Sequence, residues 1–277
     1  MATSAVPLRS AIPAARRYIQ DLWSRREFAI YLALGNLKAR NASTALGLFW
    51  WVLNPLLLGA IYALVFGVIF DARRGTTNYI AYLLAGLFAF YYTRAAMVGG
   101  VNSIISNTRL LANLQFPRLV LPLSALFESA IGFIVSLGVF YLVAGPVNGV
   151  WPGPHIWWLI PGFAVHTVLN FGLAALVARI AVPFRDVNNL VPYVLRLWLY
   201  LSPVIWPVTF LDNTSATLRA IIEKNPMFSL LAIYRHALLD TPVAVSDVLL
   251  TVAWAGLVAV IGVGSFVRHE GRMTRYL

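Results

Sequence analysis

Long apolar runs that contain few charges constrain this fold more strongly than any other feature of the sequence. A helix needs about 20 mostly apolar residues to cross the hydrocarbon core of a bilayer. The 277-residue chain is 60% hydrophobic and 11% charged, whereas soluble domains carry about 25% charged residues. Because the alternation of a β-barrel is absent, the sequence predicts an all-α integral membrane protein with six transmembrane helices. These spans are expected at residues 45–70, 79–104, 119–144, 156–182, 190–208 and 248–267.

The distribution of positive charge predicts the orientation of these helices. The net charge is +11, and the 21 Lys and Arg residues recur at the ends of apolar runs rather than in one block. Six spans place both termini on one side, which would hold fourteen cations against five on the other, with Arg94 and Arg196 inside spans. Because cytoplasmic segments are enriched in Lys and Arg, we expect a multi-pass bacterial plasma-membrane protein with both termini in the cytoplasm. The pattern also favours membrane lipid over nucleic acid as a partner.

The chain divides into an N-terminal arm, residues 1–44, and a transmembrane domain, residues 45–277. Within the arm, residues 14–37 are predicted to form an amphipathic interfacial helix. Its apolar side carries Trp23 and Leu34, its other side is rich in Arg, and Glu27 interrupts the apolar side. A basic amphipathic helix with a Trp lies at the level of the lipid headgroups. Its simplest role is that of a membrane anchor.

The stretch from Lys38 to Pro55 joins the arm to the first span. Trp50 is expected near the first interface, and Asn54-Pro55 interrupts the helix inside the membrane. Proline lacks an N–H group, so the Trp51 carbonyl loses its helical donor. Irregular backbone at membrane depth is tolerated where it lines a cavity or packs against protein. We therefore interpret this stretch as a hinge beside a channel-lining helix.

Motifs for catalysis and nucleotide binding are absent from the sequence. A phosphate-binding loop needs a Gly-rich turn that leads into Lys-Ser or Lys-Thr, and the two lysines, Lys38 and Lys224, lie in NLKAR and IEKNP. There is no Cys, and the four His residues lack the spacing of metal ligands. The chain is therefore predicted to be a non-enzymatic protein without a cofactor or metal of its own, and nucleotide energy must come from another subunit.

Ionisable residues inside a bilayer cost at least ~2.5–3.5 kcal/mol unless they are paired or hydrated. Arg94 and Glu128 each lie about ten residues, or about 15 Å, from the cytoplasmic end of their spans. We expect them to form a structural ion pair between neighbouring helices. Arg196 lies about 10 Å deep, with no acid left for it. It either faces a polar channel, where it could attract a diphosphate, or extends to the headgroups.

Aromatic residues are concentrated in the first and fifth spans. Sugar rings can stack on aromatic faces, while their hydroxyl groups bond to Tyr and Trp. The alternative is the ordinary aromatic belt at the membrane interface. The residues expected to line a substrate path are Trp50, Asn54, Pro55, Tyr193, Arg196 and Tyr200.

Four stretches together resemble the transmembrane subunits of ABC-2-type polysaccharide exporters, the permeases for O-antigen, teichoic acid and capsule. The first stretch contains Lys38, Arg40, Gly47, Leu48, Trp50, Asn54 and Pro55. The others are LLANLQFPRLVLPL, FRDVNNLVPYVLRLWLYLSPVIWP and NPMFSLLAIYRHALLD. The resemblance covers nearly the whole chain in the right order. The Ala- and Val-rich, Lys-poor composition is similar to that of actinobacterial proteins, in which a lipid-linked galactan precursor is the expected cargo.

This resemblance implies a homodimer that works with two copies of a cytoplasmic ATPase, which bind ATP and Mg²⁺. Residues 106–118 would form the coupling helix that docks on the ATPase, although an ordinary cytosolic loop is the alternative. The implied coupling residues are Asn107, Arg109, Leu111, Asn113, Phe116, Pro117 and Arg118. Residues 209–247 would form an extracytoplasmic re-entrant segment. Its implied rim residues are Asn225, Pro226, Tyr234 and Arg235.

Three other functions compete with export of a lipid-linked polysaccharide. An ABC-2 permease for a drug or a simple lipid would share the fold and have a less aromatic path. An ion-coupled secondary transporter would normally show inverted repeats and an acid at the midplane, and no clear repeat is found. A metal-dependent enzyme acting on a polyprenyl carrier needs paired carboxylates at the membrane surface, where only Asp186 is available.

Replacing Pro55 by Ala tests the hinge interpretation. The variant should restore the donor for the Trp51 carbonyl, stiffen the first span and slow export without blocking membrane insertion. Export rate and the amount of inserted protein are measured in parallel. Unchanged export would return this stretch to the role of a plain anchor.

Overall fold

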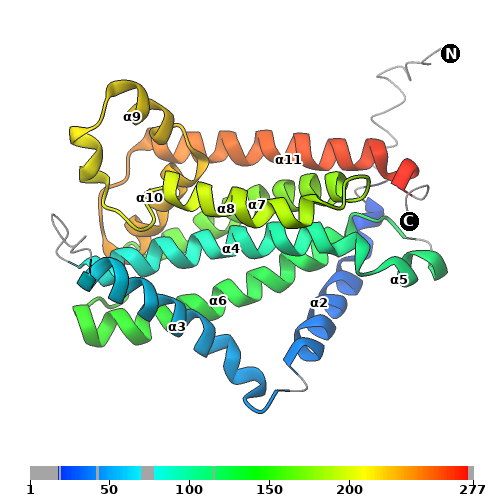
Figure 1. Cartoon of the computed structure of the whole chain (residues 1–277), viewed down its shortest axis with the longest axis horizontal. Helices are drawn as coiled ribbons and strands as arrows, with labels where there is room; N and C mark the ends of the chain where they lie inside the picture. The colour runs from blue at the N-terminus through cyan, green and yellow to red at the C-terminus, as the bar shows by residue number, and fades with distance from the viewer. Residues whose placement is uncertain (1–17, 19, 42–43, 70–77, 115, 274–277) are drawn as a thin grey trace.

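The computed structural model describes residues 18, 20–41, 44–69, 78–114 and 116–273, and their regular secondary structure is entirely helical. The all-α prediction is therefore confirmed for this part of the chain. Long helices lie side by side and run the length of the molecule, while α2 (Arg26–Asn41) and α3 (Trp50–Tyr62) run obliquely to them (Figure 1). Residues 1–17 of the arm and residues 70–77, which follow the first expected span, lie outside the described residues.

Four of the described helices are long and apolar enough to cross a membrane. They are α4 (Tyr79–Ile105), α6 (Val120–Asn148), α7 (Leu159–Ala181, preceded by the 3₁₀-helix η3, Ile156–Trp158) and α11 (Val245–Met273). They correspond to the second, third, fourth and sixth expected spans. α4 is the most buried of them because α3, α6, α7, α8 and α10 all pack against it.

The first expected span is a composite of short elements. A 3₁₀-helix η1 (Gly47–Phe49) leads into α3, which contains Pro55 and continues as a π-helical segment η2 (Ala63–Ile69). This apolar helix is shorter than the four long ones. The break at Asn54-Pro55 is thus accommodated within α3 rather than ending it.

The fifth expected span, residues 190–208, is a continuous helix only as far as Leu201. Helix α8 (Val187–Leu201) ends where Ser202 adopts an extended conformation with φ −108° and ψ 145°. A residue before proline disfavours the helical region, and Pro203 follows directly. Six uninterrupted spans are therefore not observed in the described residues.

The segment after α8 folds as three short helices. They are η4 (Val208–Asn213), α9 (Ala216–Glu223) and α10 (Pro226–Leu239). The Met227 N–H group donates to the Asn225 side chain over 3.0 Å, with Pro226 in the first turn, which is a favourable helix start. α9 and α10 lie within residues 209–247, the expected re-entrant segment.

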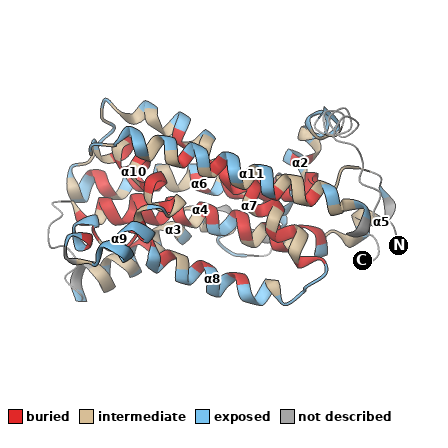
Figure 2. Ribbon diagram, turned by 90° about the horizontal axis from the view of Figure 1, so that it is seen from above, coloured by how far each residue is buried: buried red, intermediate tan, exposed pale blue. Residues whose placement is uncertain are grey.

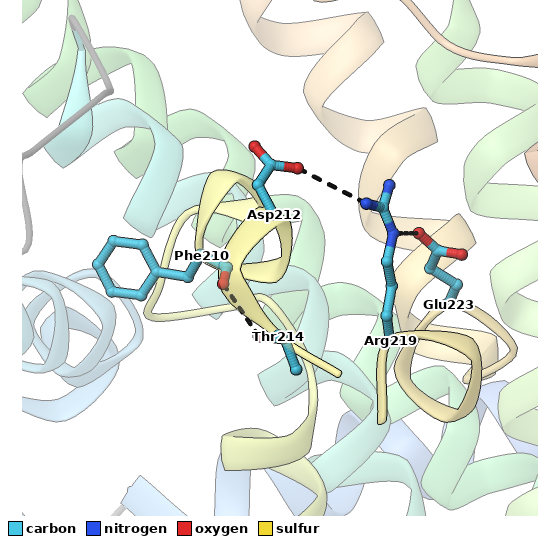
Figure 3. A network of polar contacts seen from close by, with 5 residues as sticks. All are labelled: Phe210, Asp212, Thr214, Arg219 and Glu223. Atoms are coloured by element: carbon cyan, nitrogen blue, oxygen red, sulfur yellow. Dashed lines mark hydrogen bonds and ion pairs between the residues drawn. The ribbon is translucent and has the colours of Figure 1, made fainter. Parts of the chain in front are cut away.

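Exposed polar contacts join η4 to α9 (Figure 3). The Arg219 guanidinium donates to Glu223 over 2.7 Å and lies 3.7 Å from Asp212. The Thr214 hydroxyl donates to the Phe210 carbonyl over 3.1 Å. The hydrogen bond to the Glu223 carboxylate within α9 raises the pKa of Arg219, and the same guanidinium forms the ion pair with Asp212 that joins the two short helices.

Small residues allow α4, α7 and α11 to approach closely. A Cβ atom added at Gly100 of α4 would lie 2.6 Å from the Ala174 carbonyl oxygen of α7. One added at Gly262 of α11 would lie 2.0 Å from the Gly172 carbonyl oxygen of α7. Such contacts are typical of helix packing in membranes, where close backbone approach supplies the attraction. α7 therefore packs closely against α4 on one side and α11 on the other.

The Gly172–Gly262 contact predicts a specific loss of stability. Gly262→Val should force α7 and α11 apart, at a cost of about 1–3 kcal/mol, and should lower the Tm of the detergent-solubilised protein by about 5 °C. Gly256→Val is the matched control, because no atom lies within 4 Å of a Cβ added on that position of α11. Equal melting temperatures for the two variants would contradict the close contact.

Candidate functional site

A cavity of about 960 Å³ lies between α2, α3, α4 and α6. In Figure 1, α2 and α3 form the two arms of a V beside the long helices. Ala29, Ala33 and Leu37 form the buried stripe of α2, which packs against α6. α3 packs against α6 and α4, so the lining of the cavity comes from one chain. It is the natural starting point for a substrate site.

Three of the residues expected on a substrate path line this cavity. They are Trp50, Asn54 and Pro55 on α3. Glu128 of α6 and Tyr91 of α4 line it as well. The stretch interpreted as a hinge thus lies against a cavity lined by aromatic, amide, hydroxyl and carboxyl groups.

The other three expected path residues lie elsewhere. Tyr193, Arg196 and Tyr200 occupy the exposed face of α8, with the Arg196 guanidinium carbon 5.8 Å from the centre of the Tyr193 ring. α8 packs against α4 and α7 through the opposite stripe, Val191, Leu195 and Leu199. Figure 2 shows α8 at the edge of the molecule with an exposed outer face. Within one chain the expected path is therefore divided between a cavity and a separate surface.

Arg94 and Glu128, the two residues expected to pair inside the membrane, lie on α4 and α6. α4 and α6 pack against each other, as expected for neighbouring spans. The Arg94 side chain is exposed, with its guanidinium carbon 4.9 Å from the centre of the Tyr91 ring. Glu128 is half-buried at the cavity. The Arg94–Glu128 ion pair stays a prediction.

Two of the expected rim residues are buried instead, and their placement at a rim is wrong. Tyr234 is 1% exposed, and its hydroxyl lies 3.0 Å from Nδ1 of His166. Nε2 of that histidine lies 2.7 Å from the Thr93 hydroxyl. Arg235 is 5% exposed and lies over the Tyr82 ring at 3.5 Å. Both side chains are drawn inward because α10 packs against α4 and α7.

The turn that follows α8 explains why the core accepts Arg235. Its guanidinium donates to the Pro203 carbonyl. Tyr79 donates to the Ile205 carbonyl over 2.7 Å, and Tyr82 donates to that of Trp206 over 3.2 Å. Buried carbonyl groups need donors, and three side chains from α4 and α10 supply them. No sequence pattern pointed to this set of contacts.

Asn225 and Pro226 stand at the junction of α8 and α10. The Trp198 indole donates to Asn225 over 2.8 Å, and the Asn225 amide donates to the Ser202 hydroxyl over 2.8 Å. This half-buried amide therefore ties the end of α8 to the start of α10.

The connection between α4 and α6 contains a short helix, α5 (Thr108–Asn113). The Asn107 amide donates to the Ser103 carbonyl over 2.8 Å, which holds the start of the connection to α4. Arg109 is exposed, whereas Leu111 packs on a small apolar cluster beside Ile104. The side chain of Asn113 lies outside the described part of the chain.

The end of this connection is held from two sides. Phe116 makes an edge-to-face contact with Phe28 of α2 at 5.5 Å. The Arg118 backbone N–H donates to the Glu270 carboxylate over 2.6 Å, and the Arg118 guanidinium donates to the Glu270 carbonyl over 2.9 Å. Pro117, between them, is half-buried. The connection is therefore fastened to α2 and to the end of α11.

Sequence reasoning did not single out Glu270, Phe28 or Tyr18. Burial, reinforced by the neighbouring Glu270 carboxylate, raises the pKa of the Tyr18 hydroxyl, which stays neutral at physiological pH. Glu270 could have been noticed in the sequence, because it is an acidic residue in an otherwise basic tail after the last span.

Comparison with known proteins identifies the group to which this architecture belongs. The model of the ABC-2 type transporter family matches residues 30–239. The O-antigen export system permease protein RfbA of Myxococcus xanthus is 30% identical over 246 residues, covering 86% of this chain and 93% of the relative. A protein of the same name from Klebsiella pneumoniae is 26% identical over 243 residues, covering 87% and 92%.

A relative from a second export system is similar over a shorter part of the chain. The capsule polysaccharide export inner-membrane protein BexB of Haemophilus influenzae is 25% identical over 214 residues, covering 74% of this chain and 76% of the relative. The region matched by the family model begins in α2 and ends with α10. It contains the cavity, the connection with α5 and the outer face of α8. The chain belongs to the ABC-2 type transporter family.

Proposed function

We propose that this chain is the membrane permease of an ATP-driven exporter for a lipid-linked polysaccharide. The observation that carries the proposal is similarity over 86% of the chain to a permease named for O-antigen export. The capsule export relative supports the same substrate class. A lipid-linked galactan precursor is the proposed cargo within that class, on the basis of the composition of the chain.

The proposed exporter contains two copies of the chain. The exposed face of α8 carries Tyr193 and Tyr200, which are 67% and 53% exposed, together with Arg196. In a homodimer this face would lie across the translocation path from its symmetry mate. Tyr rings suit sugar stacking, and a guanidinium in a polar path suits a diphosphate. The alternative role of Arg196 is extension to the lipid headgroups.

The connection that contains α5 is the proposed docking element for two cytoplasmic ATPase subunits, which bind ATP and Mg²⁺. Its exposed Arg109 can meet an acidic groove, while Phe116 and Arg118 hold the connection to the permease. Both termini and this connection then lie in the cytoplasm. The composite α3–η2 segment and α8 with its following turn complete the proposed set of six membrane segments.

Controlled depletion of the chain tests the proposed function. In the source bacterium, depletion should remove the polysaccharide from the cell surface while the lipid-linked precursor accumulates on the cytoplasmic side. Glycan analysis of whole cells and of isolated membranes measures both pools, and the wild-type gene should restore them. Unchanged glycan pools would overturn the proposal, and lost efflux of a drug or simple lipid in that case would assign the alternative function.

Glu270→Ala tests the proposed coupling. Removing the carboxylate should free the Arg118 backbone N–H and loosen the end of the connection, since a hydrogen bond to a charged group is worth about 1.5–3 kcal/mol. In reconstituted exporter, transport should fall about tenfold while ATP hydrolysis stays within about twofold of wild type. Arg268→Ala, an exposed change on the same helix end, should leave both rates unchanged. Wild-type transport by Glu270→Ala would remove Arg118 and Glu270 from the coupling route.

A further inference from the structure

We propose that the cavity between α2, α3, α4 and α6 binds a neutral sugar unit of the exported glycan, and not its lipid-linked phosphate. This inference rests on the proposed function and adds a site within each subunit, separate from the α8 face. It is carried by the hydrogen-bonding state of the cavity wall.

Three serine hydroxyl groups on the wall donate their protons to carbonyl groups of their own helices. Ser103 donates to the Gly100 carbonyl over 2.7 Å, Ser124 to Leu121 over 2.8 Å, and Ser129 to Leu126 over 2.8 Å. Each serine hydroxyl has one proton and two acceptor lone pairs. All three serines line the cavity, so what they can still offer a ligand is acceptors.

Two of the four asparagines that line the cavity, Asn102 and Asn107, also donate to their own helix. The Asn102 amide donates to the Val98 carbonyl over 3.0 Å, and the Asn107 amide donates to that of Ser103 over 2.8 Å. One of the two amide N–H groups of each side chain is thus bonded to its own helix. The carbonyl end is the free acceptor. On the α4 and α6 side of the cavity, these five side chains therefore offer more hydrogen-bond acceptors than donors.

An acceptor-rich wall selects the chemistry of its ligand. Sugar hydroxyl groups donate hydrogen bonds, whereas an ionised phosphate or diphosphate only accepts them. Among the described lining residues Glu128 is acidic, and none is Lys or Arg. A buried anion needs positive partners or N–H donors, so this wall favours a neutral polyol over the phosphate of the carrier.

Aromatic groups complete the site. Trp50, Trp51 and Tyr91 line the cavity and can stack on the C–H face of a sugar ring. The Trp51 indole N–H is buried and has no hydrogen-bond partner among the described residues. Buried polar groups are normally paired, and a ligand hydroxyl oxygen would supply the missing acceptor. The volume of about 960 Å³ falls at the upper end of the range for small-molecule sites.

Two glycines on α6 provide a matched test by filling the cavity. No atom lies within 4 Å of a Cβ added at Gly132 or at Gly138, and only Gly132 lines the cavity. Gly132→Phe should reduce glycan export at least about tenfold, whereas Gly138→Phe should stay within about twofold of wild type. Both variants must insert and support ATP hydrolysis by the partner subunit. Equal export by the two variants would overturn the inference.

A second experiment reads the site without measuring export, so its outcome is independent of the proposed function. The chain contains no Cys, which allows single-cysteine labelling in the purified permease–ATPase complex in nanodiscs. Ser129→Cys should react with a cationic methanethiosulfonate reagent, and excess lactose should slow this reaction at least about threefold. Inorganic pyrophosphate at the same concentration should leave the rate unchanged.

Ser265→Cys on α11 is the control for this labelling. Ser265 makes the same type of bond to its own helix, to the Gly262 carbonyl over 3.0 Å, but lies outside the cavity lining. Its labelling rate should not respond to lactose. Protection of Ser129→Cys by pyrophosphate, or no protection by lactose, would contradict a neutral sugar site. If depletion of the chain leaves the glycan pools unchanged while lactose still protects Ser129→Cys, only the proposed function is refuted.

Discussion

The bilayer core offers no water to backbone N–H and C=O groups, and the rest of this structure depends on that constraint. Helices satisfy most of these groups within a single segment. Where α8 ends at Leu201, the following carbonyl groups need donors from elsewhere. Tyr79 and Tyr82 of α4 and Arg235 of α10 provide them. Because these donors come from distant parts of the sequence, the break in one helix fixes the positions of α4 and α10.

Helix α2 of the arm touches both of the surfaces proposed to act in transport. Near its start, Phe28 of α2 contacts Phe116 of the connection with α5. Towards its end, Asn36 and Leu37 line the cavity. A rigid helix that touches both places can transmit a displacement from one to the other. The proposed ATPase contact and the proposed sugar site are thus linked through packed side chains of α2, with Arg118 and Glu270 fastening the connection on its other side.

Much of the fold could be predicted from local sequence. Apolar length identified the four helices that the structure describes as long and apolar. The connection at 106–118 and the placement of Trp50 beside Asn54-Pro55 also followed from local pattern. The end of α8 could have been predicted from Pro203, since its effect on the preceding residue is local. These features are determined by residues that are adjacent in the sequence, so hydrophobic periodicity and the position of proline are enough to predict them.

The sequence by itself determined that this chain is helical, membrane-embedded and built around an interrupted first span, because length, composition and proline are properties of single segments. Only the tertiary structure decided that Tyr234 and Arg235 turn inward, and that Trp50 and Tyr193 belong to different surfaces. It alone revealed that serine and asparagine side chains leave an acceptor-rich cavity wall. These outcomes depend on which donor meets which carbonyl across helices, and such pairings leave no periodic trace in one sequence.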